Sequence, residues 1–171
     1  SYNGNSDYLI EVADGNTGVT VEDLTFNDTN GALKGAITNP DSAAAEDGLT
    51  ISGTSYEGFA GTTVLDFNDA TTDISNVTVT DNVFNVGDTD VIDLNADLNG
   101  DASGDVEFLN VSGNDLTFNS AGSGATGMKL AIAKDSNDGG AETIADNVID
   151  GTDNSSSGTG IDLSGDKADL T

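Results

Sequence analysis

The residues best suited to chemistry in this chain are oxygen-bearing side chains that alternate along residues 95–107. Asn95, Asp97 and Asn99 stand two residues apart, and Gly100 follows where a sharp turn is needed. A calcium ion takes six to eight oxygen ligands, which such a loop supplies from alternate positions. We therefore predict a Ca²⁺ site with these ligands: Asn95, Asp97, Asn99, Asp101, Asp105 and Glu107.

This stretch resembles the calcium loops of EF-hand and dockerin-type modules, but the match is incomplete. Asn95 stands where those loops carry Asp, and Val106 stands where they carry their last acidic ligand. Flanking helices are not evident either. The resemblance implies an oxygen-ligand loop between strands, and the alternative is an Asp/Asn/Gly hairpin loop without an ion.

Few other side chains could catalyse a reaction. The chain has no His and no Cys, which excludes a His-based relay, a Cys nucleophile and the preferred ligands of zinc. Paired carboxylates can hydrolyse glycosides, but among 31 acidic residues some pair always lies at a suitable distance. We expect that the protein is not an enzyme.

The charge balance restricts the partners of the chain. It has 31 acidic residues, 25 of them Asp, against 4 lysines, for a formal net charge of -27. Such a surface repels nucleic acid and anionic membranes, and it opposes compaction unless cations screen it. We expect no nucleic-acid partner, and no apolar stretch is long enough for membrane insertion. Adaptation to a halophilic environment would explain the same charge without any site.

The absence of Cys and the first residue, Ser1, bear on location. Either a leader was cleaved, which implies export, or an initiator Met was trimmed before a small residue. Composition favours export, so we expect an extracellular protein at the cell surface.

Apolar residues alternate with polar ones in many short segments, as in Val19–Val21 and Val77–Val79. This alternation predicts strands, and the abundant Asp, Asn and Gly predict tight turns between them. We therefore expect an all-β, antiparallel β-sandwich of the jelly-roll or immunoglobulin-like type over residues 15–171. The pentapeptide Asp-Leu-Thr-Phe-Asn occurs at 23–27 and 115–119, which reflects either two similar halves or chance in a biased composition.

The N-terminal segment, residues 1–14, is a candidate assembly element. Its apolar strand contains Tyr8, Leu9, Ile10 and Val12. Such a strand either pairs within its own sheet or acts as a donor strand, inserting beside the open edge of a neighbouring subunit.

The composition as a whole resembles that of S-layer proteins, filament and appendage subunits, and calcium-dependent repeat adhesins. The resemblance implies self-assembly of β-domains, often bridged by Ca²⁺. We expect a structural subunit of an extracellular filament, appendage or lattice, whose partners are further copies of itself. The alternatives are a calcium-dependent adhesin or glycan-binding module that contacts surface glycans, and a virion decoration or fibre protein.

Overall fold

The computed structural model of the chain describes residues 7–12, 16–39, 46–67, 74–94, 109–119, 124–132, 143–152 and 158–165. Every helix or strand in these ranges is a β-strand. All the pairings between those strands are parallel. The predicted antiparallel sandwich is therefore wrong, and the chain instead winds as a parallel β-solenoid.

Three long sheets form the walls of the solenoid. The six-stranded sheet contains β1 (Tyr8–Glu11), β4 (Gly35–Thr38), β8 (Thr63–Asp66), β12 (Asp90–Leu94), β15 (Thr126–Ile132) and β18 (Thr159–Gly165). The β2 sheet contains β2 (Thr20–Glu22), β6 (Thr50–Ser52), β10 (Val77–Thr80), β13 (Leu109–Ser112) and β16 (Thr143–Ala145). The β3 sheet contains β3 (Thr25–Asn27), β7 (Ser55–Glu57), β11 (Val83–Val86), β14 (Asp115–Asn119) and β17 (Val148–Thr152). A short pair joins β5 (Glu46–Asp47) and β9 (Ile74–Ser75).

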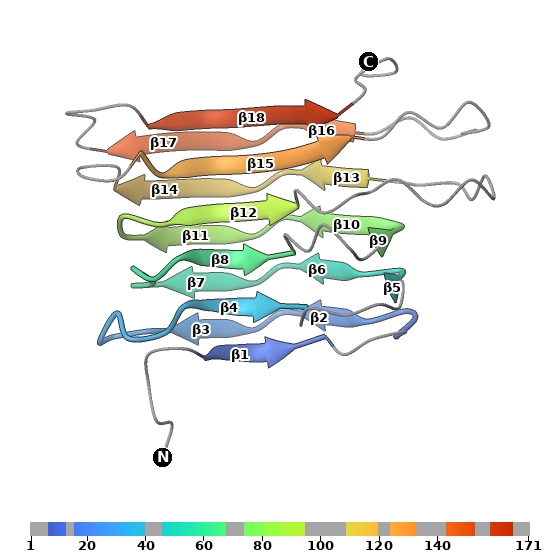
Figure 1. Cartoon of the computed structure of the whole chain (residues 1–171), viewed down its shortest axis with the longest axis horizontal. Helices are drawn as coiled ribbons and strands as arrows, with labels where there is room; N and C mark the ends of the chain where they lie inside the picture. The colour runs from blue at the N-terminus through green and yellow to red at the C-terminus, as the bar shows by residue number, and fades with distance from the viewer. Residues whose placement is uncertain are drawn as a thin grey trace.

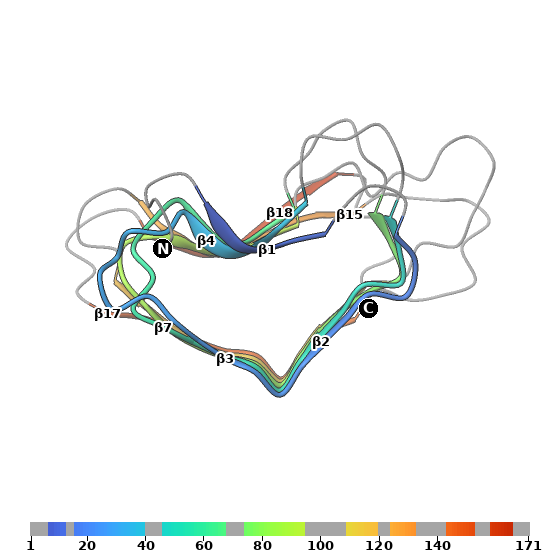
Figure 2. The ribbon, with the colours of Figure 1, turned by 90° about the horizontal axis from the view of Figure 1, so that it is seen from below.

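The chain visits the β2 sheet, the β3 sheet and the six-stranded sheet in turn, and then begins the next coil (Figure 1). Val21, Ile51 and Val79 occupy equivalent places on successive coils. From a residue to its partner one coil further on, the chain takes 27–36 residues. The coils stack from β1 at one end to β18 at the other. Viewed along the stack, the β2 and β3 sheets meet in a sharp V, and the six-stranded sheet closes the third side (Figure 2).

A two-residue corner makes this V and explains why the antiparallel prediction failed. Its first residue has a left-handed backbone, with φ of 53° at Asp23, 60° at Gly53 and 57° at Asp81. Gly adopts this conformation without strain, and Asp tolerates it better than most residues. The same Asp, Asn and Gly signals that predict hairpins therefore also suit a corner. Here they turn the strand sideways into the next sheet without reversing it.

The second corner residue points inward and forms a ladder of buried amides. Asn82 and Asn114 are 0% and 1% exposed. The Asn82 side chain donates to the Ile51 carbonyl on the preceding coil at 3.0 Å, and Asn114 donates likewise to Val79 at 2.9 Å. Because buried polar groups need partners, the ladder holds the corner of each coil in register with the next.

Apolar side chains fill the interior in rows that run along the stack. In the β3 sheet, the ring centroids of Phe26 and Tyr56 lie 5.4 Å apart, and those of Tyr56 and Phe84 lie 4.6 Å apart with nearly parallel planes. The row continues through Leu116 and Ile149. Burial raises the pKa of the Tyr56 phenol, and the Thr54 side chain only partly opposes this rise. The phenol therefore stays neutral at ordinary pH.

Candidate functional site

The predicted calcium ligands lie outside the described residues. This applies to all six of them: Asn95, Asp97, Asn99, Asp101, Asp105 and Glu107. Within the described ranges, no three His, Cys, Asp or Glu side chains are grouped closely enough to hold a metal ion. The calcium site in the 95–107 loop therefore stays a prediction.

The predicted assembly strand lies at the edge of the six-stranded sheet. Tyr8, Leu9 and Ile10 belong to β1, which pairs in parallel with β4 of the same chain. Val12 follows directly, is 4% exposed, and donates its N–H to the Thr38 carbonyl at 2.8 Å. The strand thus pairs within its own chain through one edge, and its other edge is the end of the sheet.

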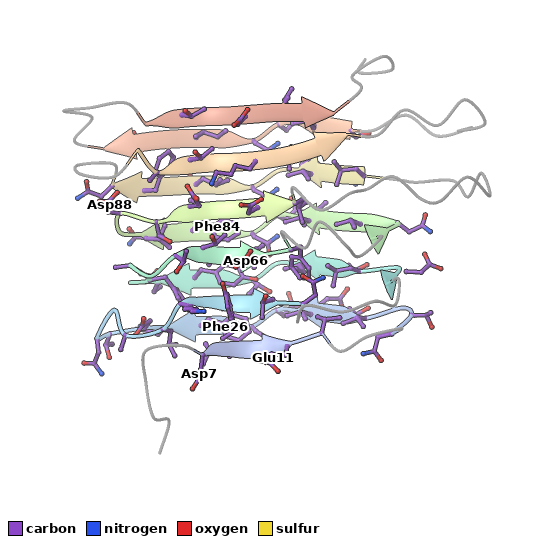
Figure 3. The ribbon with its side chains drawn as sticks, viewed as in Figure 1. Asp7, Glu11, Phe26, Asp66, Phe84 and Asp88 are labelled. Atoms are coloured by element: carbon purple, nitrogen blue, oxygen red, sulfur yellow. The ribbon has the colours of Figure 1, made fainter. Side chains whose placement is uncertain are left out.

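A row of mostly charged residues crosses all six strands of this sheet. These residues, which we call the polar row, are partners in register: Glu11, Thr38, Asp66, Asp93, Lys129 and Asp162. The residue before each of them belongs to an apolar row that includes Ile37, Leu65 and Ile92, all 0% exposed. Because side chains alternate across a strand, the polar row lies on the opposite face of the sheet. Thr38 and Asp93 are buried there, whereas Glu11 and Asp162 at the two ends of the row are exposed. Figure 3 labels Glu11 and Asp66 of this row.

Tyr8 ties the first strand to this row. Its hydroxyl donates to Asp66 Oδ2 on β8, so the side chain reaches across the intervening strand β4. Gly35 on β4 makes the crossing possible, because a Cβ there would lie 2.6 Å from the Tyr8 ring. Burial, the hydrogen bond with Asp66 and the charges of Asp66 and Asp93 all raise the pKa of Tyr8. The phenol therefore remains a hydrogen-bond donor.

Lys129 is the only cation of the polar row, and acidic side chains surround it. Its Nζ bonds to Asp90 Oδ2 and lies 3.7 Å from Asp93 Oδ2. Asp90 also accepts the Thr126 N–H through Oδ1 at 2.7 Å. Desolvation lowers the pKa of Lys129, but the hydrogen bond with Asp90 and the charges of Asp90, Asp93 and Asp162 outweigh it, so the net pKa is raised.

A cavity of about 380 Å³ opens beside this ion pair, and Thr62, Asp88, Asp90 and Lys129 are among the residues that line it. Figure 3 shows Asp88 at the margin of the strand stack. A lysine acts as a nucleophile or base only when it is deprotonated, and Lys129 is held protonated. The described part of this cavity therefore offers carboxylates and hydroxyls that can bind a polar ligand, with Lys129 as their countercharge.

The two ends of the solenoid form a second candidate surface. Strands β1, β2 and β3 close one end, and β16, β17 and β18 close the other. Their inward-facing apolar side chains are only partly covered, in contrast to the fully buried middle coils. These residues are Leu9, Ile10, Val19 and Phe26 at the first end, and Ile144, Ile149, Ile161 and Leu163 at the second. Both ends therefore combine a strand edge with half-buried apolar surface.

Comparison with known proteins adds no relative: no family model, no curated protein and no solved structure matches this chain.

The sequence did not predict the polar row or the hydrogen bond between Tyr8 and Asp66. One sequence signal could have found the coil. A four-residue pattern recurs about every 30 residues: Val or Ile, any residue, Asp or Gly, and then often Asn. Examples are Val79-Thr-Asp-Asn82 and Val111-Ser-Gly-Asn114.

Proposed function

We propose that the protein is a structural subunit of an extracellular assembly, in which copies associate end to end through strand edges. The observation that carries the proposal is the pair of end surfaces, where edges of parallel sheets meet half-buried apolar rows. An open edge is a template for another strand. In a solenoid, each coil is stabilised mainly by its neighbours.

The occupant that best fits each end is a second copy of this chain. All six strands of the six-stranded sheet are parallel and in register. This sheet also has one strand more than the other two, so its end strands, β1 and β18, come into contact first when two copies approach end to end. A copy related by translation along the stack would place its β1 beside β18 of the preceding copy. This is strand addition through the predicted donor strand.

Extending the register across this junction identifies the residues in contact. Ile161 of one copy would join the apolar row that ends at Ile10 of the next. In the polar row, Asp162 would lie beside Glu11, about 4.8 Å away between neighbouring strands. The apolar contact favours association, whereas the two carboxylates repel each other. A cation between them, such as Ca²⁺, would remove this repulsion.

Sedimentation velocity tests the proposal directly. The purified chain should be a small species in EDTA and should form large, regular species with millimolar Ca²⁺ at constant ionic strength. Ile161→Lys should block assembly, because it places a charge on the end surface. Val148→Lys is the matched control, since this residue of the same coil is 59% exposed on the side wall. A monomer under both conditions, or equal assembly of both variants, would contradict the proposal.

A further inference from the structure

The outer face of the β2 sheet carries a regular array of hydroxyl groups. Its inward residues are the buried Val21, Ile51, Val79 and Val111 and the partly buried Ile144, and the residues on either side of each face outward. Seven of the ten outward positions are Thr or Ser. This hydroxyl lattice consists of Thr20, Thr50, Thr78 and Thr143 in one row, which Asn110 interrupts between Thr78 and Thr143. The other row contains Ser52, Thr80 and Ser112, with Glu22 and Ala145 at its two ends.

The lattice is flat as well as regular. Neighbouring strands in most sheets rotate by roughly 20–25° relative to each other. In Figure 2, by contrast, the strands of the β2 sheet overlie one another when viewed along the stack. Hydroxyls on neighbouring strands therefore lie about 4.7–4.9 Å apart along the stack, and those at the two outward positions of β6 and of β10 lie about 6.6 Å apart along the strand. The result is a nearly rectangular two-dimensional grid.

The hydroxyls of this grid are available to an external partner. Ser52 bonds to Glu22 at 3.4 Å and Ser112 bonds to Asn110 at 2.8 Å. Within the described part of the chain, the Thr hydroxyls of the lattice make no side-chain hydrogen bond. Thr is also branched at Cβ, which restricts its χ1 rotation. The methyl and hydroxyl groups are therefore held in repeating positions at little entropic cost.

The face is also nearly free of charge. Glu22 is its only ionisable residue among the ten outward positions, in a chain with a net charge of -27. The neighbouring β3 sheet differs, because its outward rows mix Asp115 and Asp150 with Val83 and Val148. A flat, neutral grid of hydroxyl and methyl groups suits a neutral crystalline solid that is itself a lattice of hydrogen-bonding oxygens.

We propose that the outer face of the β2 sheet binds ice. The two repeats of the lattice are close to the two oxygen repeats on a prism face of hexagonal ice, so several hydroxyls can meet lattice positions together. Methyl groups between the hydroxyls order the first layer of water, which helps that water to join the crystal. The face has no aromatic side chain to stack on sugar rings, so a crystalline polysaccharide fits it less well.

Partition of the full chain into slowly grown ice tests this proposal, together with freezing-point hysteresis. Both are measured in EDTA on dilute protein, so that their outcome does not depend on end-to-end assembly. The wild-type chain should be enriched in the ice and should delay crystal growth. Thr50→Lys with Thr78→Lys should reduce both signals to the level of a protein that does not bind ice.

The matched control changes the same two coils on the other wall. Ser55→Lys with Val83→Lys adds the same charge to the outer face of the β3 sheet and should leave ice binding unchanged. Circular dichroism verifies that each variant is folded. Absence of ice enrichment in the wild type, equal loss in both double variants, or binding to microcrystalline cellulose without binding to ice would overturn the proposal.

Discussion

Asn82 and Asn114 lie 32 residues apart in the chain and are joined by two hydrogen bonds to a single oxygen. Asn114 Oδ1 accepts the Asn82 backbone N–H at 3.1 Å and its side-chain Nδ2 at 3.0 Å. Asn147 repeats the arrangement one coil further on, accepting from Asn114 at 3.0 Å and 2.9 Å. Each of these asparagines thus accepts hydrogen bonds from the Asn of the preceding coil and donates hydrogen bonds to the Asn of the next coil.

Removal of one amide from the middle of this ladder should therefore destabilise the fold strongly. Asn114→Ala leaves the Asn82 backbone N–H and its side-chain Nδ2 without the Asn114 oxygen as acceptor, and removes a donor to the Val79 carbonyl. Each unsatisfied buried group costs about 1–3 kcal/mol, so we expect a loss of about 2–4 kcal/mol of unfolding free energy. Urea denaturation followed by circular dichroism measures this loss.

An exposed asparagine one strand away provides the control. The exposed Asn85 side chain donates to the half-buried Glu57 carboxylate at 3.3 Å, so Asn85→Ala should change stability by less than about 0.5 kcal/mol. If Asn114→Ala proved equally mild, the ladder would not be what holds successive coils in register.

The sequence indicated many short strands, as at Val77–Val79, but not their topology. Alternation places apolar side chains on one face of a strand whether its neighbours are parallel or antiparallel. The repeated pentapeptide was misleading for a related reason. In the structure, Asp115 is aligned through the successive strands with Thr25 and not with Asp23. The two copies are thus out of phase by two residues, and their similarity is not the repeat that builds the fold.

The polar row was hidden because its members have no common residue type. Glu11, Thr38, Asp66 and Lys129 become neighbours only through the coil register. The loops between coils vary in length, so no fixed spacing in the sequence connects these residues. The hydroxyl lattice was hidden in the same way, since a Thr in an alternating segment is ordinary until its counterparts on other coils are known.

Replacement of Lys129 should lower the unfolding free energy, because the acidic side chains around it lose their countercharge. Lys129→Met keeps most of the side-chain volume but removes the countercharge of Asp90 and of Asp93, which is 2% exposed. Since the lysine is partly solvated, we expect a loss of about 1–2 kcal/mol, below the cost of breaking a fully buried pair. Lys34→Met, at an exposed position, is the control, and a similar loss in both variants would rule out a specific role for Lys129.

Alkaline pH should unfold the protein, and Tyr56 should contribute to this. Burial raises the pKa of Tyr56 above its usual value, which is about 10 in an unfolded chain. Below pH 10 the phenol is neutral in both states and has no effect on the pH dependence. Above pH 10 only the unfolded state loses the proton, so stability falls by about 1.4 kcal/mol per pH unit for this group.

Tyr56→Phe isolates that contribution. It removes a buried hydroxyl and preserves the stack with Phe26 and Phe84, so the variant should be at least as stable as the wild type at pH 7. Its stability should decline less steeply between pH 10 and pH 12 in urea titrations. The raised pKa values of Tyr8 and Lys129 act in the same direction and leave a residual slope. An unchanged slope in the variant would mean that Tyr56 ionises freely in the folded protein.

The calcium dependence of assembly should reside in two carboxylates at the proposed junction. Asp162 and Glu11 end the polar row at opposite ends of the solenoid, so only end-to-end contact brings them together. Glu11→Gln with Asp162→Asn removes the repulsion between them and should allow assembly in EDTA. Glu57→Gln with Asp115→Asn makes the same charge change on the outer face of the β3 sheet and should leave assembly dependent on Ca²⁺.

Sedimentation velocity of both double variants separates local bridging from general screening. If screening of the whole negative charge governed assembly, the two variants would behave alike, since each removes two charges from a net charge of -27. If calcium acted through the 95–107 loop, neither variant would assemble in EDTA. Assembly of the junction variant alone is expected only when the ion lies between neighbouring copies, because that contact is where these two side chains meet.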